Sequence, residues 1–183
     1  MAIARLGCAV LVLVAATLAH AGTASAQESK SAPLARQLAA ALDAGKLDSV
    51  AAKDPTAADV FCAALYFPGA QLLVVAAKYS VPQLLEERIA KKEYRDTYLD
   101  LNGAAVPATK IFIQDGAADG LKPKSGDNQA PDSYEAAGKQ TLFDGDAKKQ
   151  KISEQEYQKL FSEADDRYAK ILTALIAQLK KTS

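Results

Sequence analysis

The residues best suited to hold a ligand lie where an apolar run meets a helical pattern in the middle of the chain. Lys78, Tyr79 and Ser80 end the apolar run, and a helical pattern starts at Val81. A helix N-terminus offers free backbone N–H groups and a partial positive charge, which favour an anion beside an ammonium and a hydroxyl. We therefore expect a small anionic or flat aromatic ligand at this junction.

Further cations follow the junction at helical spacing. They stand at positions i, i+3, i+4 and i+7 and would share one face of a helix that extends far enough: Arg88, Lys91, Lys92 and Arg95. The candidate cofactor- or ligand-binding residues are therefore Lys78, Tyr79, Ser80, Arg88, Lys91 and Arg95. The alternative is a solvated basic face that neighbouring glutamates partly neutralise.

Other residues with reactive or metal-binding side chains are interpreted as structural. Cys62 stands in the apolar stretch 60–67, where burial would raise the pKa of its thiol and make it inert. Several aspartates between 115 and 146 suggest calcium, but Ala117 and Gly126 occupy two ligand positions of the EF-hand pattern. We expect solvated loop carboxylates instead: Asp115, Asp119, Asp127, Asp132, Asp144 and Asp146.

The N-terminus has the three parts of a secretory signal peptide. Arg5 precedes an unbroken apolar run over residues 8–19, and Ala24-Ser25-Ala26 offers a cleavage pattern. Cleavage after residue 26 would remove His20, the only histidine of the chain. The exported chain could then form neither a Ser-His-Asp triad nor the usual histidine-containing zinc site. We expect an exported protein, periplasmic or extracellular, with no catalytic or metal-binding residues.

Length and charge limit the partners. Residues 27–183 fit one globular domain. The chain carries 22 basic and 22 acidic residues, which gives no general attraction to nucleic acid. After residue 26 no apolar run is long enough to span a membrane.

Local patterns predict alternating helices and strands. The expected elements, in chain order, are a helix over 33–45, a short helix over 47–52, strands over 60–67 and 71–79, a helix over 81–92, short strands over 97–101 and 110–114, a long loop over 115–138, a strand over 140–143 and a helix over 153–181. Ser153 and Glu156 form a capping box at the start of the last helix, and an apolar stripe runs along its whole length.

These elements predict an α+β fold. We expect a small, mostly antiparallel sheet or a split β-barrel that is flanked by helices and closed by the long C-terminal helix. The element order, with the segments LYFPGAQLLVVAAKYSVPQLLEERI, YLDLNG and KIFIQDGAADGL, resembles the pyridoxamine-phosphate-oxidase-like, FMN-binding split-barrel family. The resemblance implies flavin mononucleotide at a dimer interface, with Lys78 and Ser80 nearest to its phosphate.

Two functions remain open. In the first, the chain is a non-catalytic exported domain of uncharacterised role, without a cofactor, that binds a small ligand or a protein partner. In the second, it is an FMN-dependent oxidoreductase of the split-barrel type and forms a homodimer. The missing catalytic motifs favour the first function, so we do not expect an enzyme.

Overall fold

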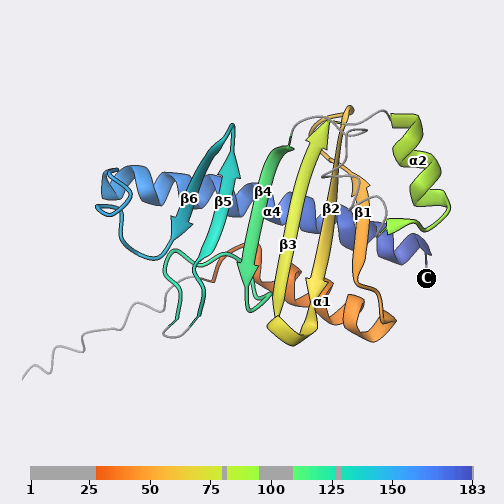
Figure 1. Ribbon diagram of the computed structural model, residues 1–183, viewed down its shortest axis with the longest axis horizontal. Helices are drawn as coiled ribbons and strands as arrows, with labels where there is room; N and C mark the ends of the chain where they lie inside the picture. The colour runs from red at the N-terminus through yellow and green to blue at the C-terminus, as the bar shows by residue number, and fades with distance from the viewer. Residues whose placement is uncertain (1–27, 80–81, 95–108, 127–128, 183) are drawn as a thin grey trace, which may run out of the picture.

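The computed structural model describes residues 28–79, 82–94, 109–126 and 129–182. In this part of the chain, helices and strands alternate as an α+β fold (Figure 1). The helices are α1 (Ala32–Gly45), α2 (Pro82–Ala90) and α4 (Glu154–Thr182), with one 3-10 turn at Pro68–Ala70. The strands are β1 (Ser49–Lys53), β2 (Val60–Phe67), β3 (Leu72–Tyr79), β4 (Thr109–Gly116), β5 (Asp132–Ala136) and β6 (Lys139–Phe143).

The strands form one antiparallel sheet whose spatial order β1 to β6 is also the chain order. Each strand therefore pairs with its neighbour in sequence, as short connections favour. Of the two sheet forms that the sequence left open, the structure has the open sheet. The α+β prediction is confirmed, with the long C-terminal helix packed against the sheet.

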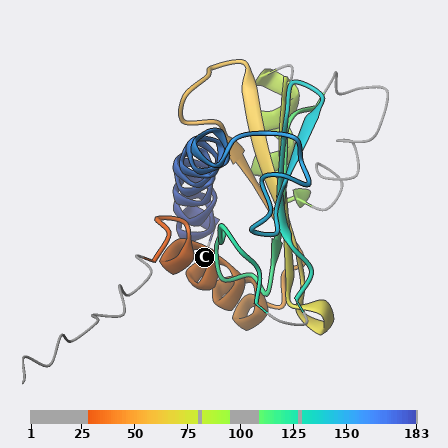
Figure 2. The ribbon, with the colours of Figure 1, turned by 90° about the vertical axis from the view of Figure 1, so that its left-hand side faces the viewer.

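One face of the sheet carries α1 and α4 (Figure 2). Alternate residues of each strand point to this face, so β2 contributes Val60, Cys62 and Ala64 to the main core. Helix α4 crosses behind all six strands, and its buried stripe includes Tyr168 and Leu172. This arrangement gives the longest apolar stripe of the chain its burial.

Helix α4 begins where the capping box of Ser153 and Glu156 predicts. The Ser153 hydroxyl accepts a hydrogen bond from Glu156 N at 3.1 Å, and Glu154 and Glu156 place negative charge in the first turn. Helix α1 likewise contains Pro33 in its first turn and ends at Gly45, with Lys46 in a left-handed conformation. Both ends of the predicted first helix are confirmed.

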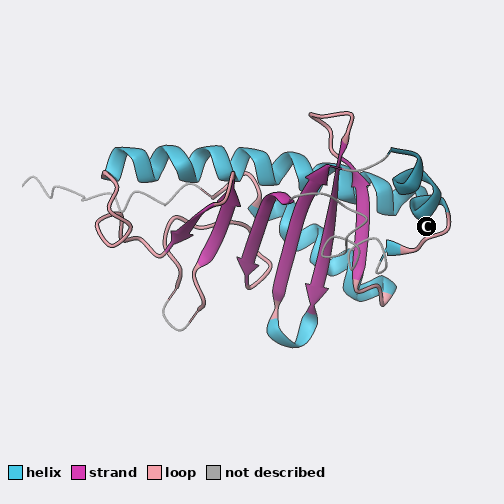
Figure 3. Ribbon diagram, turned by 45° about the horizontal axis from the view of Figure 1, so that its top comes forward, coloured by secondary structure: helices cyan, strands magenta, loops and turns pink. Residues whose placement is uncertain are grey.

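The opposite face of the sheet has an apolar half and a polar half. Helix α2 lies at the β1 end of the sheet (Figure 3). On β1 to β3 a group of apolar side chains packs beneath α2 in a second cluster. On β4 to β6 a hydrogen-bonded row crosses the strands, since Gln140 Nε2 donates to Ser133 Oγ and this hydroxyl donates to Gln114 Oε1. Helix α2 therefore covers the half that needs burial, and the polar half faces water.

Two of the predicted elements were wrong, and one cannot be compared. Residues 47–52 hold strand β1 instead of a short helix, because pairing with β2 outweighs the weak helical preference of its alanines. The predicted long loop contains β5, which a two-residue turn joins to β6. Ala137 and Gly138 both have positive φ, as such hairpin turns require. The strand predicted at 97–101 lies outside the described residues.

Both edges of the sheet are closed to a further strand. The hydrogen bond from Asp54 N to Val60 O continues the β1–β2 ladder, so the backbone groups of Ala51 face away from β2. Ala51 is nevertheless completely buried. At the other edge, the Gln150 amide accepts from Leu142 N at 3.0 Å and donates to its carbonyl, where a pairing strand would bind. Such devices prevent sheet-to-sheet association.

None of the described helices combines the length and the apolar character that a membrane-spanning helix needs.

Candidate ligand-binding site

Lys78 lies on the α2 face of the sheet, near the end of β3. It pairs with Phe61 of β2 and stands two residues from Ala76 on the same face, and both neighbours belong to the cluster beneath α2. Lys78 is only 5% exposed, and it has no hydrogen bond or ion pair with the described residues. A buried lysine normally has a counter-ion. Burial lowers the pKa of Lys78, because the interior disfavours its charged form.

The cluster to which Phe61 and Ala76 belong contains further aromatic side chains. Phe61 and Tyr94 are buried in the cluster beneath α2, and Phe112 of β4 packs against it from the side. The Tyr94 hydroxyl is enclosed and has no hydrogen-bond partner. A buried hydroxyl without a partner costs stability, so an unsatisfied group here is a sign of a missing acceptor. Lys78 and Tyr94 thus bring a cation and a hydroxyl donor to one apolar cluster, which we call the Lys78 site.

The floor beneath this cluster is made of alanine. Ala51, Ala63 and Ala76 stand side by side in the registers of β1, β2 and β3, and all three are buried. Their small side chains allow Leu85 of α2 and the ring of Tyr94 to pack close to the sheet. Small residues at these paired positions are therefore what lets α2 pack on this end of the sheet.

The other predicted site residues are placed differently. Tyr79 follows Lys78 and is 42% exposed, and its ring lies 5.0 Å from the ammonium of Lys110. This distance is typical of a cation–π contact. Ser80 and Arg95 lie outside the described residues, so the hydroxyl and the last cation of the prediction cannot be located.

The predicted basic helix face does not form as a stripe of α2. The helix ends at Ala90, and Lys92 has a positive φ of 60°. Arg88 is therefore in the last turn, while Lys91 follows it and forms an exposed ion pair with Glu87 at 2.5 Å. Exposed pairs of this kind are worth little. Among the predicted cations that the structure describes, Lys78 is thus the one that the fold buries without a partner.

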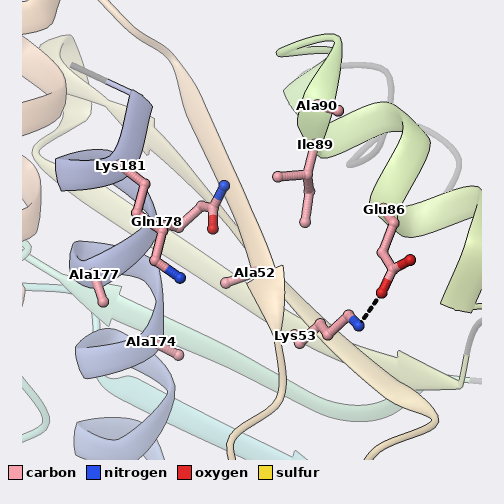
Figure 4. Close-up of a pocket in the computed structure, with 9 residues that line it drawn as sticks. All are labelled: Ala52, Lys53, Glu86, Ile89, Ala90, Ala174, Ala177, Gln178 and Lys181. Atoms are coloured by element: carbon pink, nitrogen blue, oxygen red, sulfur yellow. Dashed lines mark hydrogen bonds and ion pairs between the residues drawn. The ribbon is translucent and has the colours of Figure 1, made fainter.

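A cavity of about 520 Å³ opens beside β1, between α2 and the end of α4 (Figure 4). Its walls are mostly small and apolar, and Ile89 points from α2 toward Ala52. The polar groups at its mouth include Lys53 and Glu86, which form an ion pair with each other. The size suits a small ligand. Two of its three charged side chains, Lys53 and Glu86, already pair with each other, and the third, Lys181, is exposed. This edge cavity therefore makes a weaker case for a ligand than Lys78 does.

Cys62 is buried, as predicted, and its Sγ donates to the carbonyl of Ala52 at 3.4 Å. Burial raises the pKa of this thiol, and the nearby carboxylate of Asp54 raises it further. Asp54 is itself held by Arg167 of α4 and accepts from Thr56 N at 2.8 Å. The thiolate is therefore disfavoured, and Cys62 has the properties of a core residue.

The interpretation of the aspartates as solvated was wrong for two of them. Asp115 is completely buried and Asp132 is 3% exposed, because both point toward α1 and α4. The pattern KIFIQD could have predicted the burial of Asp115, since residues 111, 113 and 115 share one face of a strand and the first two are isoleucines. No group of acidic, histidine or cysteine side chains within the described residues could hold a metal ion. Tyr94 is buried as well, although nothing near it in the sequence distinguishes it from the other tyrosines.

Comparison of the chain with protein-family models, with curated proteins and with solved structures gave no match. The resemblance to the split-barrel family therefore stays a prediction, and the function has to be argued from the geometry.

Proposed function

We propose that this protein is an exported, non-catalytic domain that binds a small anionic ligand at the Lys78 site. One observation carries the proposal: Lys78 is buried at 5% exposure and has no counter-ion among the described residues. Desolvation disfavours the charged form of Lys78, and an anionic ligand would offset that cost.

The surroundings define the class of ligand. An anionic group, such as a carboxylate or a phosphate, would bind the ammonium of Lys78. A flat or apolar body would pack against Phe61 and Phe112, and an acceptor atom would receive the hydroxyl of Tyr94. Flavin mononucleotide has a phosphate and a flat ring and belongs to this class, so the flavin alternative becomes one arm of the test.

Two features favour binding over catalysis. The chain after residue 26 contains no histidine to act as a base, and its cysteine is buried with a raised pKa. A protein partner that adds a strand is disfavoured, because Ala51 is buried at one edge and Gln150 covers the other. Binding of a small ligand on the sheet face is therefore the best-supported function.

Calorimetry on the chain 27–183 tests the proposal. The probes are flavin mononucleotide, inorganic phosphate and benzoate, titrated into wild type, Lys78→Met and Lys91→Met. We expect at least one probe to bind wild type and Lys91→Met equally, and Lys78→Met at least tenfold more weakly, about the worth of one charge-assisted hydrogen bond. Lys91 is the matched control because it is an exposed lysine just after α2 that already pairs with Glu87.

Tyr94→Phe gives an independent readout. The hydroxyl has no partner in the free protein, so its removal should leave the melting temperature unchanged or slightly higher. Tyr94→Phe should also weaken the binding of whichever probe depends on Lys78. Equal binding by wild type and Lys78→Met would overturn the proposal, as would no binding of any probe to wild type.

A further inference from the structure

We propose that Asp115 and Asp132 share one proton at neutral pH, and that this proton controls how firmly the start of α1 and the middle of α4 are held to the sheet. The pair lies on the face that carries α1 and α4, opposite to the Lys78 site. The proposal is therefore independent of the proposed function.

The strand register brings the two carboxyl groups together. Gln114 pairs with Ser133, so the next positions along β4 and β5 are Asp115 and Asp132, opposite each other. Side chains at opposing positions start from Cβ atoms about 4.5–5.5 Å apart. The two residues share the face of Ile113, which belongs to the main core, and almost no water reaches either of them.

Asp115 is surrounded by neutral donors. Its Oδ1 accepts from Asp119 N at 3.1 Å, and its Oδ2 accepts from Gly120 N at 3.0 Å. The hydroxyl of Tyr168, from α4, donates to the same Oδ2 at 2.9 Å. Three donors hold the carboxyl in place, but none of them brings the positive charge that would neutralise it.

Asp132 is in a similar position, with Gly116 N and Lys122 N donating to its two oxygens at 2.8 Å each. The loop that faces the pair brings one cation, the Lys122 ammonium, which already pairs with Asp119 at 2.5 Å. From α4 comes another carboxylate, Asp165, which accepts from the backbone at the start of α1. Negative charge thus exceeds positive charge around the pair, among the described residues.

Both carboxyl groups consequently hold protons more tightly than usual. Burial, reinforced by the charge of Asp132, raises the pKa of Asp115 to about 7. Burial raises the pKa of Asp132 to about 6, against the opposing effect of the two N–H donors. Burial is the largest cause for both groups, and the charge of Asp132 adds to it at Asp115, so one proton is retained near neutral pH.

The pair is linked to two helices. Asp115 fixes the turn that follows β4, and that turn lies against the start of α1, where Leu121 N donates to Ser31 Oγ at 3.0 Å. Tyr168 connects the same carboxyl to α4. Loss of the shared proton would leave two buried charges at the point where α1, α4 and the sheet meet. We expect that point to open more readily as the pH rises.

NMR of the wild-type chain 27–183 tests directly whether Asp115 and Asp132 retain a proton at neutral pH. The side-chain carboxyl carbons of Asp115 and Asp132 should titrate in two steps, at least one of them above pH 5.5. The exposed Asp166, which pairs with Lys30, serves as the surface reference in the same spectra. Titration of both buried carboxyls near pH 4 would overturn the proposal.

Hydrogen exchange tests whether this proton controls how firmly α1 and α4 are held to the sheet. After correction for the intrinsic rate, the Gly120 and Leu121 amides should open at least tenfold more often at pH 8 than at pH 5 in wild type, about the effect of one pKa unit. Asp132→Asn should remove most of this dependence, whereas the matched surface change Asp166→Asn should retain it. Equal opening at both pH values in wild type would overturn the link to the helices.

Discussion

Gly120 lies against Ala32 at the start of α1 so closely that a Cβ atom on Gly120 would be 2.3 Å from the Cα of Ala32. No real Cβ atom approaches backbone so closely, so the turn after β4 can contact α1 only through a glycine. Gly120 also has a φ of +92°, which disfavours any other residue. This contact connects the sheet to α1 in the middle of the helix-covered face.

Gly120→Ala should destabilise the fold by roughly 2–5 kcal/mol, the sum of backbone strain and a clash with α1. Gly138→Ala is the matched control, because Gly138 has a φ of +75° but no atom within 4 Å of its virtual Cβ. That control should lose only about 1 kcal/mol. Urea unfolding of both variants would measure the difference, and equal losses would show that the contact with Ala32 is unimportant.

Leu172→Ala should destabilise the protein by roughly 2–5 kcal/mol, because Leu172 is completely buried between α4 and the sheet. Thr173→Ala on the exposed face of the same helix should change stability by less than about 0.5 kcal/mol. Thermal unfolding compares the two. A chain that ends at Gln150 should aggregate, since its sheet would expose an apolar face.

Cys62 should not react with a thiol reagent unless the protein is unfolded. The side chain is buried, so a reagent cannot reach it, and its pKa is raised, so the reactive thiolate does not form. Labelling with and without denaturant would test this, and rapid labelling of the native protein would contradict it. Cys62→Ser should cost roughly 1–3 kcal/mol, because it buries a hydroxyl in an apolar strand.

Stability should depend on pH through Asp115 and Asp132. Their pKa values of about 7 and about 6 in the folded protein lie above the ordinary value of about 3.9 in the unfolded chain. The folded state therefore binds more protons between these values, and stability falls as pH rises. We expect a loss on the order of 4 kcal/mol from pH 5 to pH 8 in urea unfolding, the sum of the contributions of the two groups. Asp115→Asn should flatten this slope, and a rise in wild-type stability over the same interval would contradict the prediction.

Local sequence patterns determined most of the elements. The strand 60–67 and the capped helix after Ser153 were predicted within one residue of their observed starts, because periodicity and capping act between near neighbours. Cys62 was placed in the core for the same reason. The first helix, with Pro33 in its first turn and Gly45 at its end, follows from local rules alone.

Only the tertiary structure decided which polar groups would be buried and whether they would have partners. Lys78 was singled out from the sequence for its neighbours in the chain, but its burial accompanies a place on the sheet face beside Phe61 of β2, which only strand pairing sets. Asp115 meets Asp132 through strand register and Tyr168 through helix packing, across 53 positions of the chain in the latter case. Burial and charge pairing depend on distances between residues remote in sequence, and those distances exist only once the sheet and helices have packed.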